Sequence, residues 1–279
     1  MKNEVWFITG ASKGLGLSLV QKLLQEGYNV AATSRNEKEL KKAVGTNVER
    51  FLPLTTTLTD EGDVAKAIER TVEYFGHIDV VVNNAGYGLA GGLEELTDGE
   101  VRRNFDVNVF GSLNVIRKAL PYLRQQKSGH IFNIASIGGF IGTFPGFGIY
   151  CATKFAMHGF SESLASEVKP FGIKVTIVSP GYFRTNFLDS SLQVPTHPMD
   201  EYQLVRDSQN THQHQINGKQ VGDPEKAASA LIEAAQLDEA PLHLFLGEDA
   251  YQLAEQKINL VRTNMQSVKN LATATALAN

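Results

Sequence analysis

The chain has 279 residues, of which 26 are Lys or Arg and 30 are Asp or Glu, so its formal net charge is −4. Its hydrophobic content of 42% and charged content of 20% are those of a globular protein and exclude general disorder. The mild acidity argues against a dedicated binder of nucleic acid or of anionic membranes. The single cysteine, Cys151, excludes an internal disulfide and fits a reducing compartment, so we expect a cytoplasmic protein.

Neither the first residues of the chain nor its longest uncharged segment predicts a membrane anchor. The first residues lack the charged-then-apolar pattern of a targeting signal. The segment Ser128–Thr153 contains no Asp, Glu, Lys or Arg and is long enough to cross a bilayer. It also holds several glycines and Pro145, which would break a helix that faces lipid. We therefore expect a buried strand and a loop in this segment.

Short apolar runs alternate with amphipathic segments along the whole chain. The runs predict strands at Val5–Thr9, Val30–Thr33, Glu49–Leu54, Val80–Asn83, His130–Ala135, Lys174–Ser179 and His243–Leu246. The amphipathic segments predict helices at Gly16–Glu26, Glu37–Val44, Asp60–Phe75, Asp98 to about Gln126, Ile149–Val168, Pro224–Leu237 and Glu248–Val268. Continuous apolar strands are typical of a parallel sheet covered on both faces. Their alternation with helices predicts a doubly wound α/β fold of the Rossmann type, as one domain over residues 1–279.

Two regions interrupt this alternation. Residues 181–222 have weak periodicity and are rich in Gln, Asn, His and Ser, which predicts a loop that acts as a substrate lid. Residues 269–279 form an Ala/Thr-rich tail that we expect to fray. The last helix has an apolar face that suits either the core or a partner, and both interpretations stay open.

A glycine-rich turn follows the first strand and opens the first helix. Its residues are Gly10, Ser12, Lys13, Gly14, Leu15 and Gly16. Glycines let a pyrophosphate approach the backbone, and the start of the helix offers free N–H groups and partial positive charge. The spacing GxxxGxG differs from the general GxGxxG fingerprint. The alternative is a turn that only packs the helix on the sheet.

The end of the second strand predicts the preferred cofactor. Sites for NAD(H) place a carboxylate here, whereas this chain has Ser34, Arg35 and Asn36. Arg35 is suited to a 2′-phosphate through paired, charge-assisted hydrogen bonds, and Lys13 supplies a second positive charge. The sequence therefore predicts NADP(H). The alternative is that both cations are ordinary solvated side chains.

Tyr150 and Lys154 lie four residues apart at the start of a predicted helix, so they share one face. A neighbouring ammonium favours the phenolate, and we expect the pKa of Tyr150 to be lowered. Such a tyrosine exchanges a proton with a carbonyl oxygen near neutral pH. The alternative is a half-buried tyrosine beside a lysine that reaches solvent.

Six motifs in a fixed order resemble the short-chain dehydrogenase/reductase family. They are Thr9-Gly10-x-x-x-Gly14-x-Gly16, Asn83-Asn84-Ala85-Gly86, Asn108, Ser136, Tyr150-x-x-x-Lys154 and Pro180-Gly181-x-x-x-Thr185. The resemblance is clear over residues 4–190 and less specific to about residue 250. It implies an oxidoreductase that acts on a small-molecule carbonyl or alcohol, and assembly as a homodimer or homotetramer through the helices that carry Asn108 and Tyr150.

The resemblance also implies a role for each matching residue. Tyr150 is the general acid in reduction, Lys154 lowers its pKa and holds the nicotinamide ribose, and Ser136 polarises the substrate oxygen. Asn108 sits in a helix distortion and anchors a water that relays protons. Asn84, Ala85 and Gly86 line the adenosine and ribose side, while Pro180, Gly181, Phe183 and Thr185 belong to the nicotinamide side.

The chain departs from the family pattern at two places. Ser136 lies one residue further from Tyr150 than in many relatives, and Ile137, at the strict spacing, has no hydroxyl, so we assign Ser136. The third strand ends without the usual Asp, so we assign Thr57 and Leu58 to the adenine side and Asp60 to a helix cap.

The remaining polar and aromatic groups refine the hypothesis. His197, His212 and His214 lack accompanying acids or cysteines, so we expect no metal. Trp6 and Phe132 predict core. Six aromatic residues near the motifs predict either core or an apolar substrate pocket: Phe140, Phe144, Phe147, Tyr182, Phe183 and Phe187.

The favoured function is reduction of a medium-sized ketone or aldehyde. The alternatives are a 3-oxoacyl-thioester reductase and a non-catalytic dinucleotide sensor.

Overall fold

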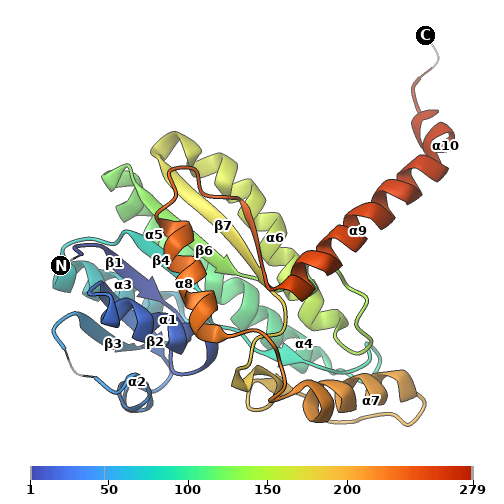
Figure 1. Cartoon of the computed structure of the whole chain (residues 1–279), viewed down its shortest axis with the longest axis horizontal. Helices are drawn as coiled ribbons and strands as arrows, with labels where there is room; N and C mark the ends of the chain where they lie inside the picture. The colour runs from blue at the N-terminus through green and yellow to red at the C-terminus, as the bar shows by residue number, and fades with distance from the viewer. Residues whose placement is uncertain (1, 47, 278–279) are drawn as a thin grey trace.

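The computed structural model of the chain describes residues 2–46 and 48–277. These residues form one seven-stranded parallel sheet in the order β3-β2-β1-β4-β6-β7-β9 and a short two-stranded ladder, β5-β8. The strands are β1 Val5–Ile8, β2 Asn29–Ser34, β3 Phe51–Thr55, β4 Val80–Asn83, β5 Gly88–Leu89, β6 Gly129–Ile134, β7 Ile173–Pro180, β8 Leu192–Gln193 and β9 His243–Leu246. The predicted doubly wound fold is confirmed (Figure 1).

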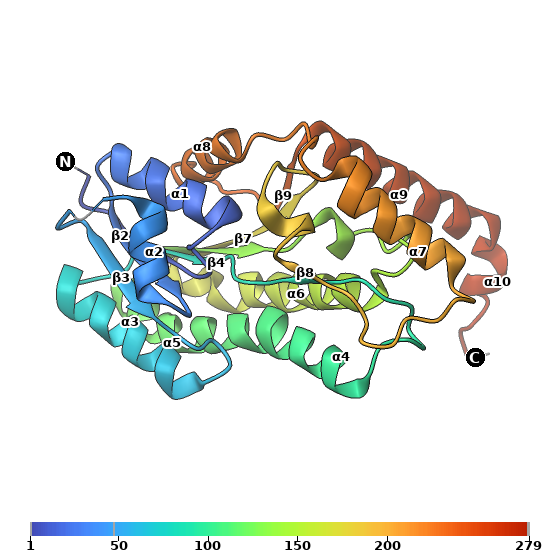
Figure 2. The ribbon, with the colours of Figure 1, turned by 90° about the horizontal axis from the view of Figure 1, so that it is seen from below.

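Helices cover both faces of this sheet (Figure 2). They are α1 Gly14–Gln25, α2 Glu37–Val44, α3 Glu61–Phe75, α4 Asp98–Phe105, α5 Gly111–Gln126, α6 Gly148–Val168, α7 Gln203–Asn210, α8 Pro224–Ala235, α9 Glu248–Ser267 and α10 Lys269–Thr273. One core layer packs α1, α2 and α8 against the sheet, and the other packs α3, α5 and α6. Successive residues of β1 alternate between them, with Trp6 in the first layer and Phe7 in the second.

The chain reverses its direction of winding between β1 and β4. Trp6 of β1 pairs with Val30 of β2 on one side and with Val80 of β4 on the other. The connections therefore diverge from β1, and the carboxyl ends of β1 and β4 open into a crevice between them. In open α/β sheets this crevice is where ligands bind.

Local signals account for several helix boundaries. Asn36 accepts hydrogen bonds from the N–H groups of Lys38 and Glu39 and starts α2, and Gly45 ends it in the left-handed conformation. The predicted cap Asp60 is confirmed, because its Oδ1 accepts from the N–H of Asp63 at 3.0 Å. The predicted strand and loop at residues 128–153 are confirmed as β6 and the approach to α6. No helix among the described residues is both long and apolar enough to cross a membrane.

Three predicted segments differ in detail from the observed elements. The helix predicted from Asp98 to about Gln126 contains a π-helical turn at Asp106–Phe110, which is the helix distortion expected at Asn108. The tail predicted to fray begins with α10. The apolar face of the last helix buries only Ala250 and Ala254, while Ile258, Val261 and Met265 are exposed. Figure 1 shows α9 extending away from the sheet, so most of it covers no part of the core.

The lid region at residues 181–222 is more ordered than the predicted loop. It contains β8, α7 and a π-helical turn at Thr211–Ile216. Two buried carboxylates, those of Glu95 and Glu100, hold this region against the rest of the fold through hydrogen bonds. Glu100 accepts from the hydroxyl of Thr196 at 2.6 Å, and Glu95 accepts from Arg206 Nη2 at 2.6 Å. The hydrogen bonds from Thr196 and Thr97 outweigh burial and lower the pKa of Glu100 to about 2.

Acidification is expected to weaken the fold through His130. Its Nε2 lies 2.9 Å from the hydroxyl of Thr176, its ring stacks on Phe132, and burial together with the charge of Lys174 lowers its pKa to about 3. An unfolded histidine titrates near 6.5. Between these values the unfolded state binds more protons, so the free energy of unfolding falls as the pH drops from 6.5 toward 3, by up to about 1.4 kcal/mol per pH unit.

Urea unfolding at pH 7.5 and pH 5.0 measures this effect. The substitution His130→Phe keeps an aromatic ring in place and leaves the Thr176 hydroxyl its acceptor, the carbonyl of Pro241 at 2.7 Å. We expect the variant to lose less stability between the two pH values than the wild type. An equal loss in both proteins would assign the acid sensitivity to other groups.

Candidate active site

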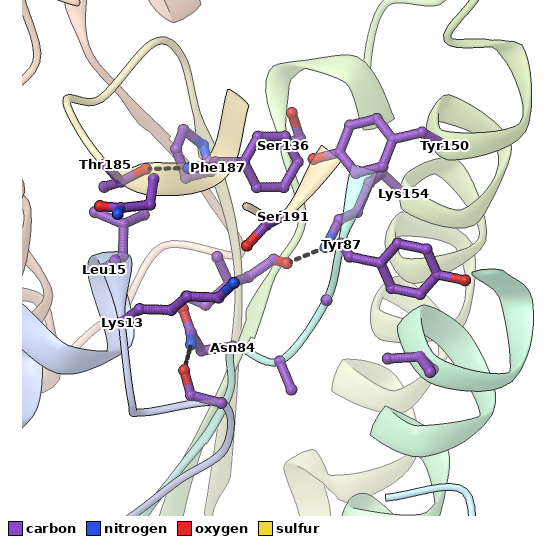
Figure 3. A pocket seen from close by; sticks show the side chains of 18 of the residues that line it. Lys13, Leu15, Asn84, Tyr87, Ser136, Tyr150, Lys154, Thr185, Phe187 and Ser191 are labelled. Atoms are coloured by element: carbon purple, nitrogen blue, oxygen red, sulfur yellow. Dashed lines mark hydrogen bonds between the residues drawn. The ribbon is translucent and has the colours of Figure 1, made fainter. Parts of the chain in front are cut away.

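A cavity of about 680 Å³ lies at the carboxyl ends of the central strands. Its wall is formed by the glycine turn, the residues that follow β2, β3, β4, β6 and β7, the start of α6 and parts of the lid. Figure 3 shows side chains from these separate parts of the chain converging on one space. This is the crevice at which the winding of the sheet reverses.

The glycine turn is shaped by close packing. Gly10 and Gly14 adopt left-handed backbone conformations, with φ of +66° and +61°. A Cβ on Gly10 would lie 2.7 Å from the Cα of Ala85, and one on Gly16 would lie 2.4 Å from Asn84 Nδ2. Gly10, Ser12, Lys13, Gly14 and Leu15 line the cavity, whereas Gly16 does not and serves this packing.

Helix α1 offers its first N–H groups to the cavity. Its N-cap, Lys13, makes no side-chain capping bond, and no acidic residue lies in the first turn. Asn84 holds the turn in place by donating from Nδ2 to the carbonyls of Thr9 at 2.9 Å and Gly10 at 3.0 Å. An uncapped helix start with a glycine approach is suited to a phosphate group.

Positive charge gathers at this end of the cavity. Lys13 and Arg35 both line it. Burial and the neighbouring charge of Arg35 lower the pKa of Lys13. Lys13 also donates to the hydroxyl of Ser190 at 3.1 Å, which ties the turn to the lid. The charge of Asp189 opposes the lowering of the Lys13 pKa only in part, and two neighbouring cations favour an anionic ligand group.

Four other residues were predicted at this end of the cavity, and all of them except Asn36 line it. Ser34 lines the cavity, but its hydroxyl bonds to the backbone of Asn36, and Asn36 itself caps α2 away from the wall. Thr57 and Leu58 line the cavity, and the N–H of Thr57 donates to Asp63 at 2.7 Å. The adjacent Thr56 is buried, and its hydroxyl has no partner among the described residues.

Tyr150, Ser136 and Lys154 meet at the opposite end of the cavity. Tyr150 is 8% exposed and Lys154 is 4% exposed. The Ser136 side chain lies beside the phenol of Tyr150, and Figure 3 shows the two side chains next to each other. Lys154 Nζ lies 5.9 Å from the centre of the Tyr150 ring and donates to the carbonyl of Ile134 at 2.8 Å. The hydroxyl at this position therefore comes from Ser136 and not from the neighbouring Ile137.

The expected lowering of the Tyr150 pKa is wrong. Burial raises the pKa of Tyr150, and the hydrogen bond from Ser136 opposes this only in part. Burial also lowers the pKa of Lys154 to about 7. In both groups the largest cause is the cost of charging a side chain away from water. Tyr150 is consequently a neutral phenol at neutral pH, which is the form that donates a proton.

Asn108 braces the site from behind its wall. It is fully buried in the π-helical turn, as the expected helix distortion requires, and it does not line the cavity. Its Oδ1 accepts from the N–H of Tyr87 at 3.0 Å, and its Nδ2 donates to the hydroxyl of Thr153 at 3.1 Å. That hydroxyl donates to the carbonyl of Tyr150 at 2.7 Å. Asn108 thus connects the segment after β4 to the first turn of α6.

The segments after β4 and β7 complete the wall between the two ends. The residues predicted to bind the dinucleotide in these segments all line the cavity: Asn84, Ala85, Gly86, Pro180, Gly181, Phe183 and Thr185. Gly181 allows a close approach of Asp249, which accepts from the N–H of Tyr182 at 2.7 Å. The lining residues that the sequence analysis missed include Tyr87, Arg103, Gln193 and Gln220. They carry no local motif and reach the site through the tertiary fold.

Aromatic side chains surround the phenol of Tyr150. Phe144, Phe147, Tyr182 and Phe187 line the cavity, with the ring of Phe187 5.5 Å from that of Tyr150. Phe140 packs against Phe245 instead, and Trp6 and Phe132 lie in the core as predicted. His212 Nε2 and the Tyr182 hydroxyl share a hydrogen bond of 2.8 Å, so His212 belongs to the pocket wall.

Comparison with known proteins agrees with this geometry. The chain is 38% identical over 274 residues to Oxidoreductase BOA17 of Botryotinia fuckeliana, which covers 98% of this chain and 99% of that protein. It is 42% identical over 190 residues to a 3-ketodihydrosphingosine reductase of Bacteroides thetaiotaomicron, which covers 68% of each.

Solved structures show the same fold. A short-chain dehydrogenase from Streptomyces avermitilis superposes with a TM-score of 0.90 at 35% identity, over 98% of this chain and 100% of that one. ElxO with NADP bound has a TM-score of 0.72 at 29% identity, over 88% and 96% of the two chains. A 3-ketoacyl-(acyl-carrier-protein) reductase from Brucella melitensis complexed with NADH has a TM-score of 0.71 at 26% identity, over 87% and 96%. Since the family model described as short chain dehydrogenase also matches residues 4–194, the chain belongs to the short-chain dehydrogenase/reductase family of oxidoreductases.

Proposed function

We propose that the protein uses NADP(H) to interconvert a medium-sized, partly apolar ketone or aldehyde and the corresponding alcohol. The observation that carries this proposal is the sharing of one cavity by two groups of residues. The glycine turn, Lys13 and Arg35 stand at one end, and Ser136, Tyr150 and Lys154 stand at the other. The first group suits the phosphates of a dinucleotide, and the second suits proton transfer to an oxygen.

The residues of the chain divide the proposed chemistry between them. A bound nicotinamide supplies the hydride in this class of reaction. The Ser136 hydroxyl donates a hydrogen bond to the substrate oxygen, and the neutral phenol of Tyr150 donates the proton that this oxygen needs to become a hydroxyl. The buried Lys154 supplies positive charge beside the phenolate that remains, and the aromatic wall excludes water from it.

The proposed preference for NADP(H) rests on Lys13 and Arg35. The solved relatives include one with NADP bound and one complexed with NADH, so the fold accommodates either dinucleotide. In this chain Arg35 follows β2 directly, at the place where NAD(H) sites carry a carboxylate, and Lys13 of the glycine turn lines the same end of the cavity. A 2′-phosphate fits that charge, whereas the 2′-hydroxyl of NAD(H) is usually bound by an acid.

Replacing Arg35 is expected to reverse this preference. Arg35→Asp removes a charge-assisted hydrogen bond worth about 1.5–3 kcal/mol, so the KM for NADPH should rise by about 10- to 100-fold relative to that for NADH. Lys38→Asp changes the net charge equally on an exposed residue that does not line the cavity, and it is the matched control. KM values for both dinucleotides with one ketone measure the effect. An equal change in the two variants would attribute it to general electrostatics and remove Arg35 from the site.

The substrate class is tested by NADPH oxidation with a panel of ketones, aldehydes and 3-oxoacyl thioesters. We expect the highest kcat/KM with a medium-sized apolar ketone, since four aromatic side chains line the pocket beside Tyr150. The relationship to a 3-ketodihydrosphingosine reductase makes a ketone on a long alkyl chain one member of the panel. Preference for the thioesters would favour a 3-oxoacyl-thioester reductase. Tight NADPH binding without turnover on any compound would favour the non-catalytic sensor.

Assembly as a homodimer or homotetramer and a cytoplasmic location are part of the proposal. Phe110 and Phe155 are 52% and 43% exposed, and they lie on the π-helical turn with Asn108 and on α6 with Tyr150. Exposed rings on both elements suit an interface between copies of the chain. Sedimentation measures the mass. The buried free thiol of Cys151 supports a reducing compartment.

A further inference from the structure

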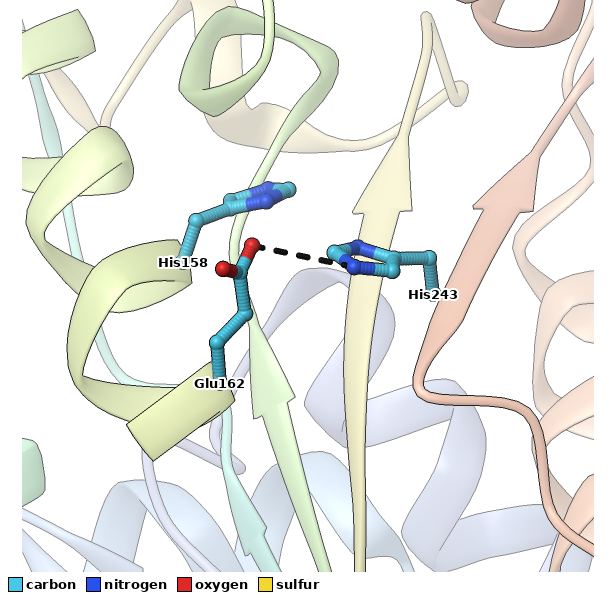
Figure 4. Close-up of side chains that lie close together, drawn as sticks. All are labelled: His158, Glu162 and His243. Atoms are coloured by element: carbon cyan, nitrogen blue, oxygen red, sulfur yellow. Dashed lines mark ion pairs between the residues drawn. The ribbon is translucent and has the colours of Figure 1, made fainter. Parts of the chain in front are cut away.

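A second cluster of chemically active side chains lies outside the cavity. His158 and Glu162 stand one turn apart on α6, and His243 is the first residue of β9 (Figure 4). One potential ligand atom from each residue lies within 4.8 Å of the other two. None of the three residues lines the cavity. The sequence analysis missed this cluster because His243 lies far from the other two along the chain.

We propose that His158, Glu162 and His243 form a binding site for a divalent transition metal ion of the zinc type. Two imidazoles and one carboxylate make a ligand set that zinc uses in proteins, with water as the fourth ligand. Imidazole also suits copper and nickel, so the ligand types define the class of metal and not one element. The sequence analysis expected no metal because it considered only the histidines of the lid.

The distances require a small adjustment on binding. Ligand bonds of about 2.0–2.1 Å in a tetrahedron place the ligand atoms about 3.3 Å apart. Glu162 Oε1 and His243 Nε2 are already 3.7 Å apart. These two side chains are 54% and 36% exposed, so rotation of either one closes the remaining gap without disturbing the core.

His158 supplies the fixed part of the site. It is buried, and its Nε2 lies 3.1 Å from the hydroxyl of Ser179 on β7. A hydrogen bond to one ring nitrogen is the usual way in which proteins orient a metal-binding histidine.

The cluster lies between an edge strand of the sheet and the helix that carries Tyr150. Strand β9 is at the edge of the sheet and pairs only with β7, while α6 carries Tyr150 and Lys154. A metal held by all three residues would join this edge strand to that helix. Since the ligands come together only in the folded chain, binding would stabilise it in proportion to the metal concentration over the dissociation constant.

Titration of the full-length protein with Zn²⁺ against a chromophoric chelator tests the proposal. We expect one ion per chain, and a dissociation constant weakened by at least about tenfold in His243→Ala and in Glu162→Gln, since each removes one of three ligands. Both residues are partly exposed, so the variants are expected to fold. His77→Ala is the matched control, because His77 also contacts a carboxylate, that of Asp79 at 3.0 Å, but without a third ligand.

Substitution with Co²⁺ gives a readout of geometry. Tetrahedral coordination produces strong visible absorption, which we expect in the wild type and in His77→Ala but not in His243→Ala. A wild-type protein that binds no ion would overturn the proposal, and so would binding that the His243 and Glu162 substitutions leave unchanged. Neither result bears on the proposed reductase activity, since these residues lie outside the cavity.

Discussion

Tyr150→Phe is expected to reduce kcat by about 10²- to 10⁴-fold while leaving the affinity for NADPH within a few fold of the wild type. The substitution removes one oxygen and keeps the ring, which packs 5.5 Å from that of Phe187. The lost oxygen is the one that lies beside Ser136 and that donates the proton in the proposed reaction. Because the shape of the wall is unchanged, we expect no loss of folding stability. Steady-state turnover and fluorescence titration with NADPH measure the two effects.

Tyr182→Phe is the matched control for this prediction. Tyr182 is a second phenol that lines the same cavity; it is half-buried, and burial raises its pKa to about 12. Its hydroxyl contacts His212 of the lid at 2.8 Å and is not hydrogen-bonded to Ser136. We expect kcat to fall by less than about tenfold. Comparable losses in both variants would mean that the cavity needs its polarity in general, and a Tyr150→Phe enzyme that kept its turnover would remove Tyr150 from proton transfer.

Lys154→Met is expected to lower kcat by at least about 10²-fold and to raise the free energy of unfolding by about 1–3 kcal/mol. Lys154 is 4% exposed, and among the described residues it donates to the carbonyl of Ile134 and contacts the sulfur of Met157, with no carboxylate as a partner. Keeping a charge there costs desolvation energy, as the pKa of about 7 indicates. Methionine fills similar space without that cost, so activity and stability should change in opposite directions.

Lys174→Met tests whether the opposite changes in activity and stability are specific to Lys154. Lys174 also donates to a backbone carbonyl, that of Leu237 at 2.7 Å, but it is solvent-accessible and does not line the cavity. We expect its replacement to leave kcat unchanged and not to stabilise the fold. Urea unfolding at pH 7 and steady-state kinetics provide both readouts. A Lys154→Met variant that is both active and less stable would show that the lysine is a structural anchor.

Much of the fold was predictable because its signals are local. The segments Glu37–Val44, Val80–Asn83 and His243–Leu246 match the observed elements to the residue, since caps, glycines and apolar runs mark their ends. The lid was not predictable in this way. Its ordered structure depends on Glu95 with Arg206 and Glu100 with Thr196, pairs that are 111 and 96 residues apart in the chain.

The candidate site likewise has a part that local signals predict and a part that depends on tertiary packing. The ordered motifs predicted that Gly10, Ser136 and Tyr150 share one site, and all three line the same cavity. Their proximity was predictable because each residue follows or starts an element whose place in the fold could be predicted. The direction of the Tyr150 pKa shift was wrong, because it depends on the depth of burial, which tertiary packing decides. Gln220, a buried lining residue whose Oε1 has no partner among the described residues, had no sequence signal.

Transfer of deuterium from NADPH labelled at C4 of the nicotinamide to an accepted ketone tests the central claim most directly, when it is measured in single turnovers of the wild type and of Tyr150→Phe. We expect the wild type to give an alcohol with one deuterium on its carbinol carbon, and the variant, saturated with the same dinucleotide, to give almost none over the same time. Equal rates of label transfer in the two proteins would contradict the account.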